Sequence, residues 1–116
     1  MKELRELKLI LGACADVTRL RILRLLADGD ERSVTDLTAL LHLSQPLVSW
    51  HLRILRRSGL IAARRSGRQS LYRLHRPGWD GLERRLEQVL APAAPAGREP
   101  ERSPRLAALR QRESAG

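Results

Sequence analysis

The sequence predicts a mainly α-helical domain that carries one small β-hairpin. Apolar residues recur at helical spacing through most of residues 4–90, and two short strand-like runs interrupt this pattern between residues 60 and 74. Capping residues, glycines and prolines separate the segments. The predicted order is four helices, the two strands of the hairpin and a last helix. A chain of 116 residues has room for one compact domain and a tail, which argues against a large enzyme.

The first two helices are predicted from apolar residues that stand three and four positions apart. Asp16 is placed to cap the second helix, and Gly29 stands where a left-handed residue would end it. The first apolar series is Leu4, Leu7, Leu11 and Cys14, and the second is Leu20, Leu23 and Ala27, with Ile22 and Leu26 beside them.

Two further helices are predicted close together in the sequence. Ser33 and Asp36 form a start that resembles a capping box, and Ser44 offers an N-cap to the next helix. Pro46 falls in the first turn, where its missing N–H is harmless, and Gly59 ends the helix. The buried positions expected are Leu37, Leu40 and Leu41 in the shorter helix, then Val48, Leu52 and Leu55.

The hairpin and the last helix complete the predicted domain. Residues 60–63 and 71–74 are short apolar runs with strand-forming residues, and residues 65–68 have the composition of a turn. After Gly78 the helical spacing returns, and Asp80 lies at the N-terminal end, where the helix dipole favours an acid. The apolar positions of this helix are Trp79, Leu82, Leu86, Val89 and Leu90.

The composition changes at Pro92. The thirteen residues from Pro92 to Pro104 contain four prolines and no apolar side chain larger than alanine, so this stretch is not expected to hold a helix. We therefore expect a folded domain over residues 1–91 and a mostly mobile tail, rich in proline, alanine and arginine, over residues 92–116.

The charge points to a polyanionic partner. The net charge is +9, and the chain has 22 Lys and Arg residues against 13 Asp and Glu residues. Eight arginines and no acid fall within residues 53–76, so most of the net charge is concentrated there. Arginine pairs well with phosphates and with base edges because its guanidinium group is a planar, forked donor.

Other features of the sequence bear on its location. No apolar run is long enough to span a membrane, and the first fifteen residues do not resemble a signal peptide. A cytoplasmic protein without a membrane partner is expected. Cys14 is the only cysteine, so no disulfide can form within the chain.

Two short helices joined by a tight turn indicate a helix-turn-helix, whose second helix enters the major groove of DNA. The side chains expected to face double-stranded DNA from this helix are Ser44, Gln45, Pro46, Ser49, Trp50, His51 and Arg53. Gln45 and Ser49 are expected to read bases. The hairpin is expected to contact phosphates or a narrow minor groove through Arg64, Arg65, Arg68 and Gln69.

Two of these residues have alternative interpretations. His51 is either a DNA contact or a structural hydrogen-bonding residue, since its neighbours along the helix point inward. Trp50 either packs against a thymine methyl group or a sugar, or covers the neighbouring core.

Three segments together resemble the ArsR/SmtB family of bacterial winged-helix repressors. They are ADVTRLRILRLL (residues 15–26), LSQPLVSWHLRILRRSGLI (residues 43–61) and RRSGRQSLYRL (residues 64–74). The resemblance covers about residues 4–90. It implies a dimeric winged helix-turn-helix that represses transcription from an imperfect palindrome and is released by a metal ion or another chemical signal. Val17 stands where the family commonly has proline.

The resemblance also implies that the first and last helices form the homodimer. A small domain with little apolar mass gains from pairing, although the residues of the last helix could instead pack on their own chain. The expected interface residues are Leu4, Leu7, Leu11, Trp79, Leu82, Leu86 and Val89.

The effector of the protein is not predicted by the sequence. The family's cysteine pair is missing from residues 34–41, and the family's histidine ligands are missing from residues 79–91, so neither of its two commonest metal sites is expected. Cys14 is the candidate sensor, against the alternative that it is a small buried apolar residue.

The expected function is that of a sequence-specific DNA-binding transcriptional regulator, a repressor that binds a palindromic operator as a homodimer. The alternative is a winged-helix protein that binds RNA or the ribosome with the same charge. The sequence has neither a glycine-rich phosphate loop nor a set of nucleophile, base and orienting residue, so catalysis is rejected.

Overall fold

The computed structural model describes residues 1–92. The tail predicted for residues 92–116 therefore lies outside the described residues, apart from Pro92. Residues Met1–Arg85 form one compact unit, and the second unit begins at Leu86, within the last helix.

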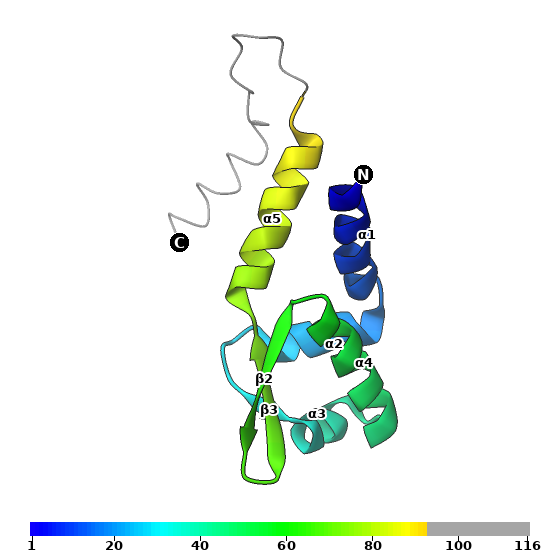
Figure 1. Ribbon diagram of the computed structural model, residues 1–116. Helices are drawn as coiled ribbons and strands as arrows, with labels where there is room; N and C mark the ends of the chain where they lie inside the picture. The colour runs from blue at the N-terminus through cyan, green and yellow to red at the C-terminus, as the bar shows by residue number, and fades with distance from the viewer. Residues whose placement is uncertain (93–116) are drawn as a thin grey trace. The chain divides into compact units, whose positions relative to one another are not determined.

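The predicted order of helices and strands is confirmed, with one short strand added. The elements are α1 (Lys2–Cys14), α2 (Val17–Leu26), β1 (Arg32–Ser33), α3 (Val34–Leu41), α4 (Gln45–Arg57), β2 (Ile61–Ser66), β3 (Gln69–Leu74) and α5 (Arg76–Leu90) (Figure 1). Strand β1 pairs antiparallel with β3, which gives a sheet in the order β1-β3-β2. Two residues are too few to show the alternation of a strand, so β1 leaves no pattern in the sequence.

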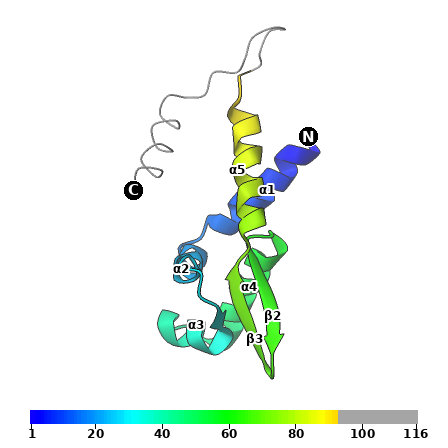
Figure 2. The ribbon, with the colours of Figure 1, turned by 90° about the vertical axis from the view of Figure 1, so that its left-hand side faces the viewer.

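Strands β2 and β3 form the predicted hairpin, and their pairing runs from Ile61 opposite Leu74 to Ser66 opposite Gln69. Gly67 in the turn has a φ of +62°, a left-handed conformation that glycine adopts without strain. In two views at right angles, the tip of the hairpin extends beyond helix α3 (Figures 1 and 2). Charged side chains at this tip are therefore available to a partner outside the helical core.

The core lies where α2, α3, α4 and the start of β2 meet. Its largest fully buried side chains are Ile22, Leu26, Leu37, Val48, Leu52, Leu55 and Leu60. All three residues predicted for the buried face of α4 belong to this set. The orientation of α4 about its own axis is therefore fixed by packing, and so is its outward face.

The apolar series predicted for α1 is buried only in part within its own chain. Leu7 is buried, and Leu4 and Leu11, which are predicted for the dimer interface, are 48% and 41% exposed. Ile10 and Ala13 complete the buried face in their place. Apolar residues extend around more than one face of this helix, so spacing alone does not decide which face the rest of the chain covers.

Helices α2 and α3 show the same effect. Leu20 belongs to the apolar series that predicts α2 but is 51% exposed, whereas Ile22 and Leu26, which stand beside that series, are fully buried. Helix α3 buries Leu37, as predicted, and leaves Leu40 45% exposed.

The predicted helix caps are present. The carboxylate of Asp16 accepts a hydrogen bond from the backbone N–H of Arg19 at 2.9 Å, which begins α2. Ser33 and Asp36 form a reciprocal capping box at the start of α3, with both hydrogen bonds at 3.0 Å. The hydroxyl of Ser44 accepts from the N–H of Leu47 at the start of α4. These caps divide the helices at the residues that the sequence indicated.

Helix α5 begins at Arg76, earlier than the predicted start after Gly78. Gly78 lies so close to Gly59 that a Cβ atom at position 78 would collide with the carbonyl oxygen of Gly59. The indole N–H of Trp79 also donates a hydrogen bond to the carbonyl of Leu60 at 3.1 Å. Further along, Arg85 pairs with Glu6 of α1 at 3.1 Å. The start of α5 is thus held against the segment that joins α4 to β2.

Arg19 connects three helices. Its Nε donates to the carbonyl of Ala13 at 2.7 Å, at the end of α1, and its Nη1 lies 3.2 Å from Nδ1 of His51 on α4. Because a guanidinium group only donates, Nδ1 accepts, which places the proton of a neutral His51 ring on Nε2. The carboxylate of Asp16 lies 3.9 Å from the same Nδ1 atom.

The environment of His51 opposes its protonation. The side chain is 5% exposed, and its burial lowers the pKa of the imidazole from its ordinary value. The positive charge of Arg19 lowers the pKa further, whereas Asp16 raises it in part. Protonation would also replace the hydrogen bond from Arg19 with repulsion between two cations.

The close approach of Gly78 to Gly59 predicts opposite effects for two glycine substitutions in α5. Gly78→Ala should lower the free energy of unfolding by about 1 to 3 kcal/mol, because two backbone segments must separate. Gly81→Ala is the matched control: its Cβ would meet only the ends of two arginine side chains at 3.9 Å. Because alanine favours a helix, this variant should be unchanged or more stable by up to about 1 kcal/mol. Urea denaturation measures both, and equal effects would contradict the close approach.

The lowered pKa of His51 predicts that acid destabilises the domain. Between the folded-state pKa and the ordinary value of 6.5, the unfolded chain binds more protons than the folded chain, so stability falls as the pH falls. We expect the free energy of unfolding to decrease as the pH falls below about 6.5, by at most about 1.4 kcal/mol per pH unit for one proton. His51→Gln retains an acceptor for Arg19 but does not titrate in this range. Its denaturation curves should therefore depend less on pH, and an unchanged dependence would contradict the assignment.

Candidate nucleic-acid interface

Helices α3 and α4 form the predicted helix-turn-helix. Helix α3 ends at His42, whose φ of 54° and ψ of 43° are left-handed. Within residues 1–92, His42 is the one residue other than glycine with a positive φ. Histidine is among the residue types that adopt this conformation more readily than most. It turns the chain sharply, so that Ser44 can cap α4 two residues later.

The outward face of α4 carries most of the residues predicted to face DNA. Ser44, Gln45, Pro46, Trp50 and Arg53 are exposed, and Ser49 is half-buried. On the opposite side of the helix, Val48, Leu52 and Leu55 are buried in the core. The helix thus presents hydroxyl and amide groups in its N-terminal half, where a helix that reads DNA contacts base edges, and the guanidinium group of Arg53 follows in its second half.

His51 departs from the expectation that it contacts DNA. It is buried and binds Arg19, so of its two interpretations the structure supports the structural hydrogen-bonding one. Its position on α4 lies toward the start of α2, beside Val48 and Leu52. The sequence alone could not show this, because the partner stands 32 residues earlier in the chain.

The hairpin brings basic side chains to one end of the sheet, but they are not equivalent. Arg65, Arg68 and Gln69 are exposed, and none of the ion pairs found within residues 1–92 involves either arginine. Arg64 instead donates through Nε to both carboxylate oxygens of Glu31, at 2.8 and 3.0 Å. This hydrogen bond lowers the pKa of Glu31 and raises the pKa of Arg64.

Glu31 is an acidic partner of the hairpin arginines that the sequence did not indicate. The arginine-rich stretch contains no acid of its own, so it was expected to be positive throughout. Glu31 directly precedes β1, and the pairing of β1 with β3 brings it to the hairpin. Arg64 is therefore less available to a phosphate than Arg65 and Arg68, because its guanidinium group would first have to leave the carboxylate of Glu31.

Cys14 is half-buried at the end of α1. Burial raises the pKa of its thiol, and the nearby Arg19 lowers it to a smaller extent. A raised pKa keeps the thiol protonated at neutral pH, and a protonated thiol is a weak nucleophile and a weak metal ligand. Within residues 1–92, no three His, Cys, Asp or Glu residues lie close enough together to hold a metal ion.

The residues predicted for the dimer interface fall into two groups. Leu7 and Leu82 are each 6% exposed and so pack within their own chain, and the indole of Trp79 is half-buried and hydrogen-bonded to Leu60. In the first unit, Leu4 and Leu11 remain exposed. In the second unit, Leu86 is half-buried and Val89 is 48% exposed.

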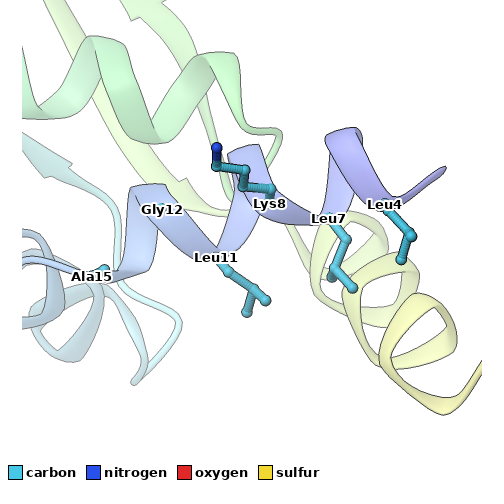
Figure 3. A pocket seen from close by; sticks show the side chains of 6 residues that line it. All are labelled: Leu4, Leu7, Lys8, Leu11, Gly12 and Ala15. Atoms are coloured by element: carbon cyan, nitrogen blue, oxygen red, sulfur yellow. The ribbon is translucent and has the colours of Figure 1, made fainter. Parts of the chain in front are cut away.

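An open depression of about 420 Å³ lies along α1. Leu4, Leu7 and Leu11 point from the same side of the helix, and Lys8 points away from them (Figure 3). Gly12 and Ala15 continue the lining, so the depression is largely apolar. None of the helices described in residues 1–92 is long and apolar enough to cross a membrane.

The central part of the chain matches a family model. Residues 16–63, from the cap of α2 into β2, match the model described as bacterial regulatory protein, arsR family. This region contains the helix-turn-helix and the residues that hold it.

Individual relatives agree with the family model. The arsenical resistance operon repressor of Escherichia coli is 48% identical over 56% of this chain and 57% of its own length. The transcriptional activator HlyU of Vibrio cholerae is 43% identical over 56% of this chain and 59% of its own length. The chain spans about half to three fifths of the length of several curated relatives that it matches.

A solved structure extends the similarity over the winged helix. The homodimeric winged helix-turn-helix DNA-binding domain of a possible ArsR-family transcriptional regulator from Mycobacterium bovis is 33% identical, with a TM-score of 0.61. The match covers 75% of this chain and 79% of that domain. With this coverage, and with the helix-turn-helix and the hairpin in place, the chain belongs to the ArsR family of bacterial regulatory proteins.

Proposed function

We propose that this protein is a transcriptional regulator that binds a palindromic DNA operator as a homodimer and represses transcription. The observation that carries the proposal is the outward face of α4. Hydrogen-bonding side chains occupy its first turns. Arg65 and Arg68, which form no ion pair with any other residue of the described part of the chain, lie at the tip of the neighbouring hairpin. A helix of this kind fits the major groove, and the hairpin then follows the backbone beside it.

The two parts of this surface have different roles. Gln45 and Ser49 read base edges, because an amide and a hydroxyl group can each donate and accept hydrogen bonds. Arg65 and Arg68 bind phosphates, which position the protein on DNA but carry little sequence information. Gln45→Ala should therefore relax the preference for one base in each half-site.

The homodimer is supported by the exposed apolar side chains of α1. Leu4 and Leu11 flank the depression on this helix, and the M. bovis relative is described as homodimeric. A two-fold dimer places two copies of α4 against successive major grooves, about 34 to 36 Å apart, and this spacing requires a palindromic site.

Repression follows from simple occupancy of the operator. A dimer that covers about two turns of the duplex excludes other proteins from those base pairs. The relatives include both a repressor and an activator by name, so a reporter gene downstream of the operator decides the direction. Expression should rise when the regulator is deleted, and a fall would refute repression.

The unequal arginines of the hairpin predict unequal effects on salt dependence. Arg65→Ala and Arg68→Ala should each reduce the slope of log K against log salt by about 0.9, because each removes one phosphate contact. Arg64→Ala should reduce it less, since Glu31 already binds this side chain. Fluorescence anisotropy with specific and random duplexes at several salt concentrations measures the slopes. Equal slopes for the three variants would contradict the arrangement.

The apolar face of α1 predicts which substitution separates the protomers. Leu11→Glu should give monomers that bind one half-site weakly, because it places a charge in the interface. Leu40→Glu is the matched control: Leu40 is 45% exposed against 41% for Leu11, but it lies on α3. Sedimentation velocity should show a dimer for the control only. A dimeric Leu11→Glu variant would exclude this face.

A competition experiment separates DNA binding from the alternative of RNA binding. Duplex DNA that contains the operator should displace a labelled operator at far lower concentration than duplex RNA of the same sequence. Equal competition by the RNA duplex would refute the proposed function.

A further inference from the structure

We propose that Trp50 determines part of the DNA specificity by contacting the C5-methyl group of a thymine in the major groove, and that Arg19 is the residue that positions it. The inference rests on the proposed function and names a chemical feature of the operator: a 5-methylpyrimidine at one position in each half-site.

Trp50 is an exposed aromatic residue on a surface that is otherwise polar. Its side chain is 49% exposed, next to Ser49 and one turn before Arg53. One turn earlier, Pro46 is exposed and Leu47 is 40% exposed. The first two turns of α4 thus offer an apolar surface beside the groups that can form hydrogen bonds.

Packing of the core does not account for this tryptophan. The buried face of α4 is completed by Val48, Leu52 and Leu55, each at most 1% exposed. Trp50 lies on the other side of the helix from Val48 by the 100° step of an α-helix. About half of its surface remains in water, which is costly for a large aromatic side chain unless a partner covers it.

The ring is held in place before DNA arrives. The guanidinium carbon of Arg19 lies 5.9 Å from the centroid of the Trp50 ring, within the range of a cation–π contact. The ring of His51 meets it edge-on, with centroids 4.9 Å apart and an interplanar angle of 63°. Arg19 is itself fixed by the carbonyl of Ala13 and by His51. A side chain already ordered loses less entropy when it binds.

The major groove contains one apolar group to which such a ring is suited. Base edges present hydrogen-bond donors and acceptors there, and the thymine C5-methyl group is the exception. Contact with this methyl group favours thymine over cytosine at that position. Cytosine methylated at C5 carries the same group in the same place, so it should substitute in part for thymine.

Deoxyuridine tests the inference, because it differs from thymidine only by the missing methyl group. Each thymine of the operator half-site, located by footprinting, is replaced in turn and the affinity is measured by anisotropy. The wild-type protein should lose about fourfold in affinity at one position, the effect of one methyl group in an apolar contact, and little elsewhere. Replacement in both half-sites should cost about sixteenfold if the two contacts are independent.

Variants assign the effect to named residues. Trp50→Ala should weaken binding to the thymine operator and bind the thymine and deoxyuridine operators equally at that position. Arg53→Ala is the control: it should weaken binding to both operators and leave unchanged the ratio of the affinity for the thymine operator to that for the deoxyuridine operator. Arg19→Lys keeps a positive charge but loses the forked contact that joins Ala13 and His51. It should reduce the ratio while leaving the affinity for random DNA unchanged, provided that its thermal unfolding confirms a folded protein.

The outcomes separate this inference from the proposed function. Specific operator binding with equal affinity for thymine and deoxyuridine at every position would overturn the role of Trp50 and leave the proposed function intact. Retention of the ratio by Trp50→Ala would also overturn it. Loss of the ratio in Trp50→Ala but not in folded Arg19→Lys would refute the positioning role. Failure to bind any operator would overturn both proposals.

Discussion

The contact between Arg19 and His51 joins α4 to α1 and α2, and it adds a directional constraint to the core packing that orients α4. The last carbonyl groups of a helix have no partners within it, and Arg19 binds two of those at the end of α1, from Gly12 and Ala13. The same guanidinium group reaches the buried ring of His51 on α4. A buried polar ring needs a partner, so α4 cannot rotate or slide without exposing His51 or leaving it unpaired. Arg19 thus connects α1, whose exposed face is proposed to form the dimer, to α4, whose exposed face is proposed to bind DNA.

Much of the fold could be predicted because the ends of its helices and strands are determined by residues close together in the sequence. Caps act over three residues, and the positive φ values of Gly29, Gly59 and Gly67 occur at the turns that the sequence indicated. The faces of α1 and α2 that the core covers do not follow from the sequence, since both helices carry apolar residues on more sides than the core covers. Only tertiary packing chooses between Leu20 and Ile22, and periodicity contains no information about that choice.

The site was predicted where it depends on one helix and missed where it depends on two distant segments. The exposed face of α4 follows directly from its buried face, so Gln45 and Arg53 were found correctly on the outside. The Glu31–Arg64 pair and the Arg19–His51 pair join residues 33 and 32 positions apart. The first pair needs strand β1, which is too short to leave a pattern in the sequence. The second needs the packing of α2 against α4, which no local rule supplies.

The strand order of the sheet bears on association between molecules at high concentration. In the order β1-β3-β2, strand β2 pairs with β3 on one side, and within residues 1–92 its other side is an open edge. An open edge offers unpaired backbone groups to a strand of another molecule, and charged side chains on it oppose that association. The outer half of β2 carries Arg64 and Arg65, both exposed. Arg64 and Arg65 therefore also oppose pairing of this edge with a strand of another molecule. Replacing them with uncharged residues would weaken the proposed DNA binding and would also make aggregation easier.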